Sequence, residues 1–163
     1  MPSNLRLLAA AAALVLLAAP IHAQEVTFGT MRADSDAPVE VSADQLSVNQ
    51  SDGTALYSGN VVIGQGEMRL SAPRVLVVYA ETRNAIARLE ATGGVTLVSG
   101  TEAAEAERAD YDIDAGTVTM SGNVLLTQGD NALTSERMVV DLDSGTAQMD
   151  GRVRTVLQPG GSE

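Results

Sequence analysis

Apolar and polar residues alternate with a period of two along most of the chain after residue 38. The alternation is regular in residues 39–42, 110–114 and 140–143. A period of two places apolar side chains on one face of a β-strand and polar side chains on the other. The pattern therefore predicts strands with one face in water, and nothing after residue 23 favours a long helix.

A four-residue motif, Ser-Gly-Asn-Val, recurs along these strands. It stands at residues 58–61 and 121–124, with looser copies at 92–95 and 150–153. The motif glycines lie 34, 29 and 29 residues apart, a spacing that indicates one supersecondary unit used several times. By parity, we expect each glycine to face inward and to bend its strand.

Turn sequences divide each repeat into two strands. One set, such as residues 114–116, precedes a strand, and a second set, such as residues 128–130, closes the unit. The second copy is longer and carries residues 81–84 at the first of these turns. The sequence therefore predicts an all-β fold of about four repeats of about 29 residues, stacked as an elongated antiparallel jelly-roll or folded sheet with two walls.

Residues at even spacing from the motif glycines are mostly aliphatic or methionine and form the predicted inner face. Flexible or small side chains suit an apolar groove without a fixed pocket shape, but the same pattern also fits a closed core. Strand patterning leaves these two interpretations open. The candidate groove-lining residues are Leu46, Val48, Tyr57, Val61, Ile63, Leu89, Val95, Leu97, Tyr111, Ile113, Val118, Met120, Val124, Leu126, Met138 and Val140.

The first 23 residues have the three parts of a secretory signal peptide. One basic residue precedes an apolar run over residues 7–19, and a site for cleavage follows after Ala23. The apolar run is too short for a membrane anchor. We therefore expect an exported protein with a flexible lead-in over residues 24–38, a folded domain over 39–158 and a flexible tail over 159–163.

The composition after residue 23 excludes most catalytic chemistry. This part of the sequence has 21 acidic residues and 10 − 1 = 9 basic residues, and it contains no Cys, His, Lys or Trp. The acidic balance disfavours nucleic acid as a partner, and the missing side chains remove thiolate, imidazole and Schiff-base chemistry. The aspartates of residues 110–114 do not fit an EF-hand loop. The sequence predicts no enzyme, cofactor or metal site.

Four short segments carry a resemblance to a known family. They are Ala43-Asp44-Gln45-Leu46 and residues 58–63, 106–111 and 121–124, following a signal peptide. They resemble the OstA-like family, in particular its LptA-like members, over about residues 39–157. The resemblance implies a V-shaped β-jelly-roll in the Gram-negative periplasm that shields lipid A acyl chains and passes lipopolysaccharide from the inner to the outer membrane during outer-membrane assembly. The alternative, a structural or adhesive β-solenoid with a closed core and no lipid ligand, is weakened by the unequal repeats.

The resemblance also implies partners that continue the edges of the sheet. An LptC-like inner-membrane protein would dock at the N-terminal edge and an LptD-like outer-membrane protein at the C-terminal edge, with head-to-tail self-association by the same contacts. Unpaired edge strands recruit partners in this way. The candidate docking residues are Val39, Glu40 and Val41 at one edge, and Val153, Thr155 and Val156 at the other.

Overall fold

A computed structural model describes residues 25–27, 37–81 and 85–157. The predicted signal peptide, most of the lead-in and the tail over residues 159–163 lie outside the described residues. All regular structure in the described part is β-strand, so the all-β prediction is confirmed. A search of the same residues finds no helix long and apolar enough to span a membrane.

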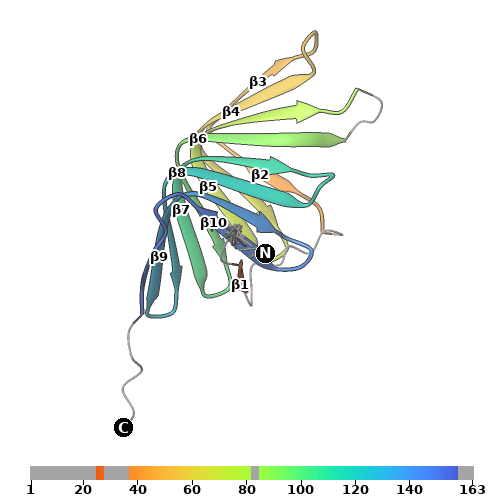
Figure 1. The fold of residues 1–163 in the computed structure, drawn as a ribbon. Helices are drawn as coiled ribbons and strands as arrows, with labels where there is room; N and C mark the ends of the chain where they lie inside the picture. Colours follow the sequence, from red (N-terminus) through yellow and green to blue (C-terminus); the bar gives the residue numbers. More distant parts are fainter. Residues whose placement is uncertain (1–24, 28–36, 82–84, 158–163) are drawn as a thin grey trace, which may run out of the picture.

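One antiparallel sheet contains every strand (Figure 1). Consecutive long strands pair as hairpins, and short strands complete the two ends. The long strands are β4 (Thr54–Gln65), β5 (Met68–Tyr79), β6 (Ile86–Ser99), β7 (Glu102–Asp112), β8 (Thr117–Gln128) and β9 (Asn131–Asp141). The short strands are β1 (Glu25–Thr27), β2 (Glu40–Ser42), β3 (Gln45–Asn49), β10 (Thr146–Asp150) and β11 (Arg154–Val156).

Each long strand bends near its middle and contributes to two walls, which splay apart as a V in Figure 1. We call these wall A and wall B. Wall A consists of β3, β10 and residues 54–58, 74–79, 86–92, 108–112, 117–121 and 137–141. Wall B consists of β2, β11 and residues 61–65, 68–72, 95–99, 102–106, 124–128 and 131–135.

A row of β-bulges creates the bend. In the β8–β9 pair the register shifts between Ser121 and Val124, so that two residues of β8 oppose the single Glu136 of β9. A β-bulge is a position where two residues of one strand lie opposite a single residue of its neighbour, and it bends the strand that carries the extra residue. The same shift occurs opposite Pro73 in the β4–β5 pair and opposite Glu107 in the β6–β7 pair. The repeated motif therefore marks the fold line of the sheet.

The motif glycines face the outer side of this fold line, so the prediction that they face inward is wrong. Gly122 has φ +82°, and Asn123 after it has φ 48°, so both residues are left-handed and break the alternation of the strand. A Cβ on Gly122 would lie 2.6 Å from Oε2 of the exposed Glu107. The Asn123 amide donates to the same carboxylate at 2.5 Å. Glycine is needed here for its conformation and for space.

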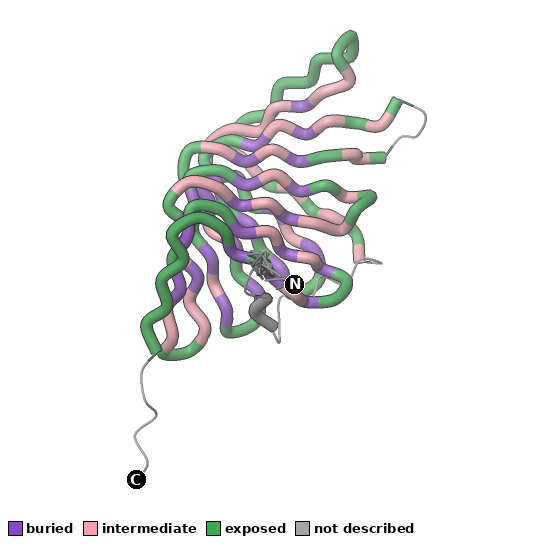
Figure 2. Tube along the Cα trace, in the orientation of Figure 1, coloured by how far each residue is buried: buried purple, intermediate pink, exposed green. Residues whose placement is uncertain are grey.

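Inward side chains from both walls form one apolar core. Buried and less buried residues alternate along the long strands in Figure 2, as a period of two requires. Four methionines belong to this core, and Met120 and Met138 are fully buried as cross-strand partners. In the described conformation the inner rows are therefore packed rather than open to water.

The two ends of the sheet are built differently. At the N-terminal end, β2 and β3 pair with the two halves of β4, and no further strand among the described residues pairs with them. At the C-terminal end, β10 and β11 pair with the two halves of β9, and β1 pairs with β10. A strand thus lies inside the segment expected to be a flexible lead-in. It supplies backbone hydrogen bonds to an edge that would otherwise lack them on wall A.

Candidate lipid-binding groove

The space between the walls is the candidate site, and most of the predicted lining residues lie there. Tyr57 and Ile113 are partly buried and pack against the core, whereas Leu46 and Val48 of β3 are 55% and 60% exposed at the N-terminal end. The other predicted residues are buried in the core. They are Val61, Ile63, Leu89, Val95, Leu97, Tyr111, Val118, Met120, Val124, Leu126, Met138 and Val140.

Sequence reasoning missed a set of small lining residues. Strand β7 places Ala104, Ala106 and Ala109 inward, each buried. Alanine has no preference for strands, so these positions give no signal of their own. Continuing the period of two from Tyr111 finds Ala109. Ala104 and Ala106 lie beyond the register shift at the bend and are found only by matching β7 to its neighbour β6. Other missed core residues are Ala55, Met68, Leu70, Val75, Val77, Leu133, Leu142 and Ala147.

A hydrogen bond joins the two walls near their open side. The Tyr111 hydroxyl of wall A donates to Oε1 of Gln65 on wall B at 2.8 Å, between two buried side chains. Burial raises the pKa of Tyr111, and the nearby Asp143 carboxylate raises it further. The phenol therefore stays protonated as a donor at neutral pH. A cavity of about 160 Å³ lies beside this contact and is lined in part by Ile113 and Leu142.

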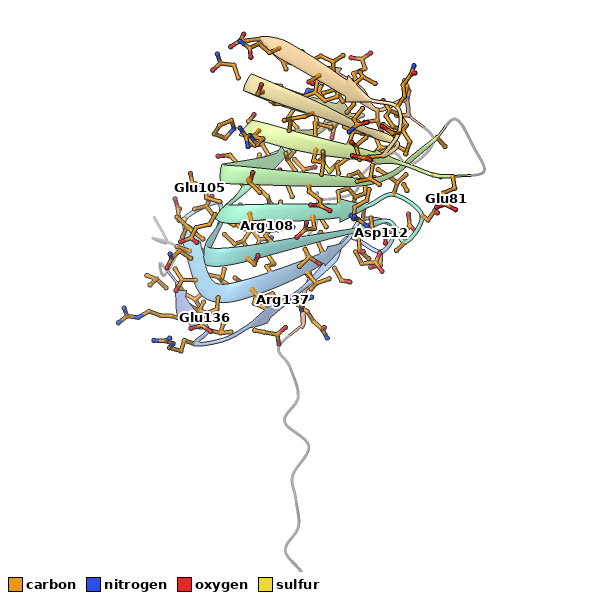
Figure 3. All side chains as sticks on the ribbon, turned by 90° about the horizontal axis from the view of Figure 1, so that it is seen from above. Glu81, Glu105, Arg108, Asp112, Glu136 and Arg137 are labelled. Atoms are coloured by element: carbon orange, nitrogen blue, oxygen red, sulfur yellow. The ribbon has the colours of Figure 1, made fainter. Side chains whose placement is uncertain are left out.

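Most charged residues lie on the outside of the sheet, and the buried Glu102 is an exception. In Figure 3, Glu105, Arg108 and Asp112 follow one another along β7, from wall B across the bend to wall A. Arg108 donates to Asp110 at 2.9 Å and to Glu90 at 3.4 Å. These pairs are solvent-exposed and contribute little to stability. Among the described residues, the inner face of wall A carries no buried charged side chain.

No group in the described residues suggests catalysis by a metal. The residues that the structure describes contain no cluster of three or more His, Cys, Asp or Glu side chains that could hold a metal ion. The arrangement offers apolar surface between two walls, polar groups at the open side and strand edges at both ends. Such a site can hold a hydrocarbon ligand and can bind a partner strand.

Comparison with known proteins identifies the family. The model of the family described as LptA/(LptD N-terminal domain) LPS transport protein matches residues 40–146. The chain belongs to this family. Its members are transport proteins rather than enzymes, and the resemblance read from the repeated strand units is confirmed.

Individual relatives agree with this assignment. The lipopolysaccharide export system protein LptA of Escherichia coli (strain K12) is 36% identical over 62 residues, which cover 38% of this chain and 31% of that protein. The R00383 protein of Rhizobium meliloti (strain 1021) is 29% identical over 116 residues, which cover 67% of this chain and 62% of that protein. The chain therefore spans less than two thirds of the length of these curated relatives.

A solved structure shares the fold. The crystal structure of LptH, the LptA-homologous periplasmic component of the lipopolysaccharide transport device from Pseudomonas aeruginosa, superimposes with a TM-score of 0.69. The match covers 78% of this chain and 99% of that chain, at 19% sequence identity. Because the sequence identity is low, this match establishes the fold alone. The ligand has to be inferred from the residues of the site.

Proposed function

We propose that this chain carries lipopolysaccharide through the periplasm, with the acyl chains held between walls A and B. The observation that carries the proposal is the two-walled sheet of a lipopolysaccharide-transport family with an inner face of aliphatic, alanine and methionine side chains. The formal net charge of −11 supports an arrangement in which anionic head groups stay in solvent while the acyl chains are enclosed. Export by a signal peptide cleaved after Ala23 is part of the proposal.

Loading of acyl chains would require the walls to separate. In the packed conformation, side chains such as Met120 and Leu126 are fully buried against other core residues. An entering acyl chain replaces these apolar contacts with contacts of the same kind, so little apolar surface is exposed to water in the exchange. Unbranched methionine side chains adapt easily to such a change of neighbour. A small free-energy difference between empty and loaded forms suits a carrier that must pass its ligand on.

Site-specific photo-crosslinking tests this function with matched neighbours on the same strands. We expect a crosslinker at Val61 or Met120, which are buried, to label lipopolysaccharide in cells. Crosslinkers at Val62 and Thr119, which point to the outer faces, are the controls and should give little labelling. Labelling is measured by immunoblot for lipopolysaccharide on the purified protein. Absence of labelling at every inner position would favour the closed-core alternative.

We further propose that the sheet edges dock an LptC-like protein at the N-terminal end and an LptD-like protein, or a second copy, at the C-terminal end. Of the candidate residues, Glu40 and Val41 lie in β2, and Thr155 and Val156 lie in β11. Val39 and Val153 directly precede these strands. The N-terminal edge has a second open strand, β3, whereas β1 already pairs with β10 on wall A at the other end. The C-terminal partner would therefore meet β11 and the outer side of β1.

Proline at Val41 is expected to weaken docking at the N-terminal edge. Proline removes a backbone donor and fixes φ, so it interrupts the pairing of β2 and of any strand added to it. Binding is measured by pull-down with the LptC-like inner-membrane partner. Val41→Thr keeps the backbone donor and the β-branched shape and should bind as the unchanged chain does. Equal pull-down by the proline and threonine variants would argue against docking through β2.

A further inference from the structure

The inner face of wall B changes from apolar to polar at its open side. The inward positions there are Gln65 at the end of β4, Ser99 and Glu102 at the β6–β7 hairpin, and Gln128 and Asn131 at the β8–β9 hairpin. Gln65, Ser99 and Glu102 are buried, and their exposed fractions are 4%, 1% and 3%. At the open side of wall A, the inward residues are instead apolar, and they include Ile113 and Leu142. Apart from the buried Met68 beside Gln65, the rim of wall B is therefore polar, whereas the rim of wall A is apolar.

Most polar atoms of this rim have protein partners. Gln65 accepts from Tyr111 and donates through Nε2 to the Ala37 carbonyl at 3.2 Å. Gln128 donates through Nε2 to Oε1 of Glu102 at 2.6 Å. The second carboxylate oxygen, Oε2 of Glu102, is buried and has no hydrogen-bond partner among the described residues. Gln128 thus orients the carboxylate and leaves one acceptor position open.

An unpartnered carboxylate oxygen in the interior carries a desolvation penalty until a donor reaches it. The next inward pair toward the bend, Ala104 and Leu126, is completely buried and apolar. A ligand that meets Glu102 must therefore present a hydrogen-bond donor at one point and hydrocarbon directly beside it. Phosphate and carboxylate groups would be repelled by the same oxygen. A metal ion would lack further ligands, because the described residues provide no cluster of three or more metal-binding side chains.

We propose that Glu102, oriented by Gln128, is a subsite for a hydroxyl or amide N–H carried on an acyl chain. The inference rests on the proposed function, because it supposes that acyl chains enter between the walls. Such a subsite would also fix the orientation of the acyl chain between the walls. The polar substituent of the chain lies at the rim of wall B, and the hydrocarbon beyond it runs past Ala104 and Leu126 toward the bend.

A pair of esters that differ in one hydroxyl tests the subsite. Methyl 3-hydroxydecanoate and methyl decanoate are titrated against a fluorescent fatty-acid probe bound to the exported, purified protein. A hydrogen bond to a charged group favours the hydroxylated ester by about tenfold in affinity. In Glu102→Leu we expect this ratio to fall to about one while methyl decanoate binds at least as well. Glu102→Leu removes the hydrogen bond from Gln128 but also a buried carboxylate with one unpartnered oxygen, so we expect the variant to fold, and thermal unfolding checks this.

Glu105→Leu is the matched control, because Glu105 lies on the same strand but is exposed on the outer face. It removes the same charge and should keep the tenfold preference. Equal affinity of the unchanged protein for both esters would overturn the subsite, as would a preference that survives in Glu102→Leu. A bound probe that neither ester displaces would also overturn the subsite. If neither the fluorescent fatty-acid probe nor either ester binds the protein, acyl-chain binding itself is rejected, and with it the proposed function.

Discussion

Replacing Gly122 with alanine is expected to lower the free energy of unfolding by about 3 kcal/mol, through backbone strain and a steric clash together. Gly122 has φ +82°, which side chains with a Cβ rarely adopt. The added Cβ would also lie 2.9 Å from the Cβ of Glu107. Rotation of the Glu107 side chain cannot relieve that contact, because a Cβ is fixed to its backbone. The strands would have to separate at the fold line.

Gly129→Ala separates the two contributions. Gly129 has φ +56°, but nothing lies within 4 Å of the position that its Cβ would take. Its substitution should therefore cost only the backbone term, about 1 kcal/mol. Urea unfolding followed by far-UV circular dichroism measures both variants. Equal losses for the two glycines would show that crowding by Glu107 is unimportant and that the fold line tolerates a side chain.

The fold was predictable because its period is short and its repeats are explicit. Alternation correctly placed Val118, Met120 and Met138 inside, and the recurring glycine correctly marked a bend. The prediction that the motif glycines face inward was wrong because counting by twos assumes an extended backbone. The glycine and the residue after it are both left-handed, and this changes which face the following residues point to. Residues 103–108 favour a helix by composition, yet they form part of β7 because two neighbouring strands pair along them.

Other features depend on how the walls meet, which local sequence does not encode. Tyr111 and Gln65 are 46 positions apart and meet because the bend brings halves of different strands together. Glu102 reads in the sequence as an ordinary charged residue after a turn, and only the fold reveals that it faces the core. Strand β1, which pairs with β10, is only three residues long. An alternation of apolar and polar residues cannot be recognised over so short a segment, so the sequence does not predict this strand.

Truncation of Leu126 to alanine is expected to lower the free energy of unfolding by about 3 kcal/mol in the absence of lipid. Leu126 is completely buried between the walls, so the lost methyl groups leave a cavity that the sheet cannot fully close. Leu125→Ala is the matched control, because Leu125 is the next residue and points to the outer face of wall B. Its loss should stay within about 1 kcal/mol. Urea unfolding measures both variants.

The same pair of variants decides between a closed core and a groove. At a given concentration, a ligand that binds the folded state more tightly stabilises it more, with the logarithm of its affinity. If acyl chains lie between the walls, they can fill the space that Leu126→Ala creates, and a bound acyl ester should stabilise this variant more than the unchanged chain. The ester should stabilise Leu125→Ala and the unchanged chain equally. Equal stabilisation of all three would mean that the chains do not reach Leu126, so the interior at that depth would serve as core alone.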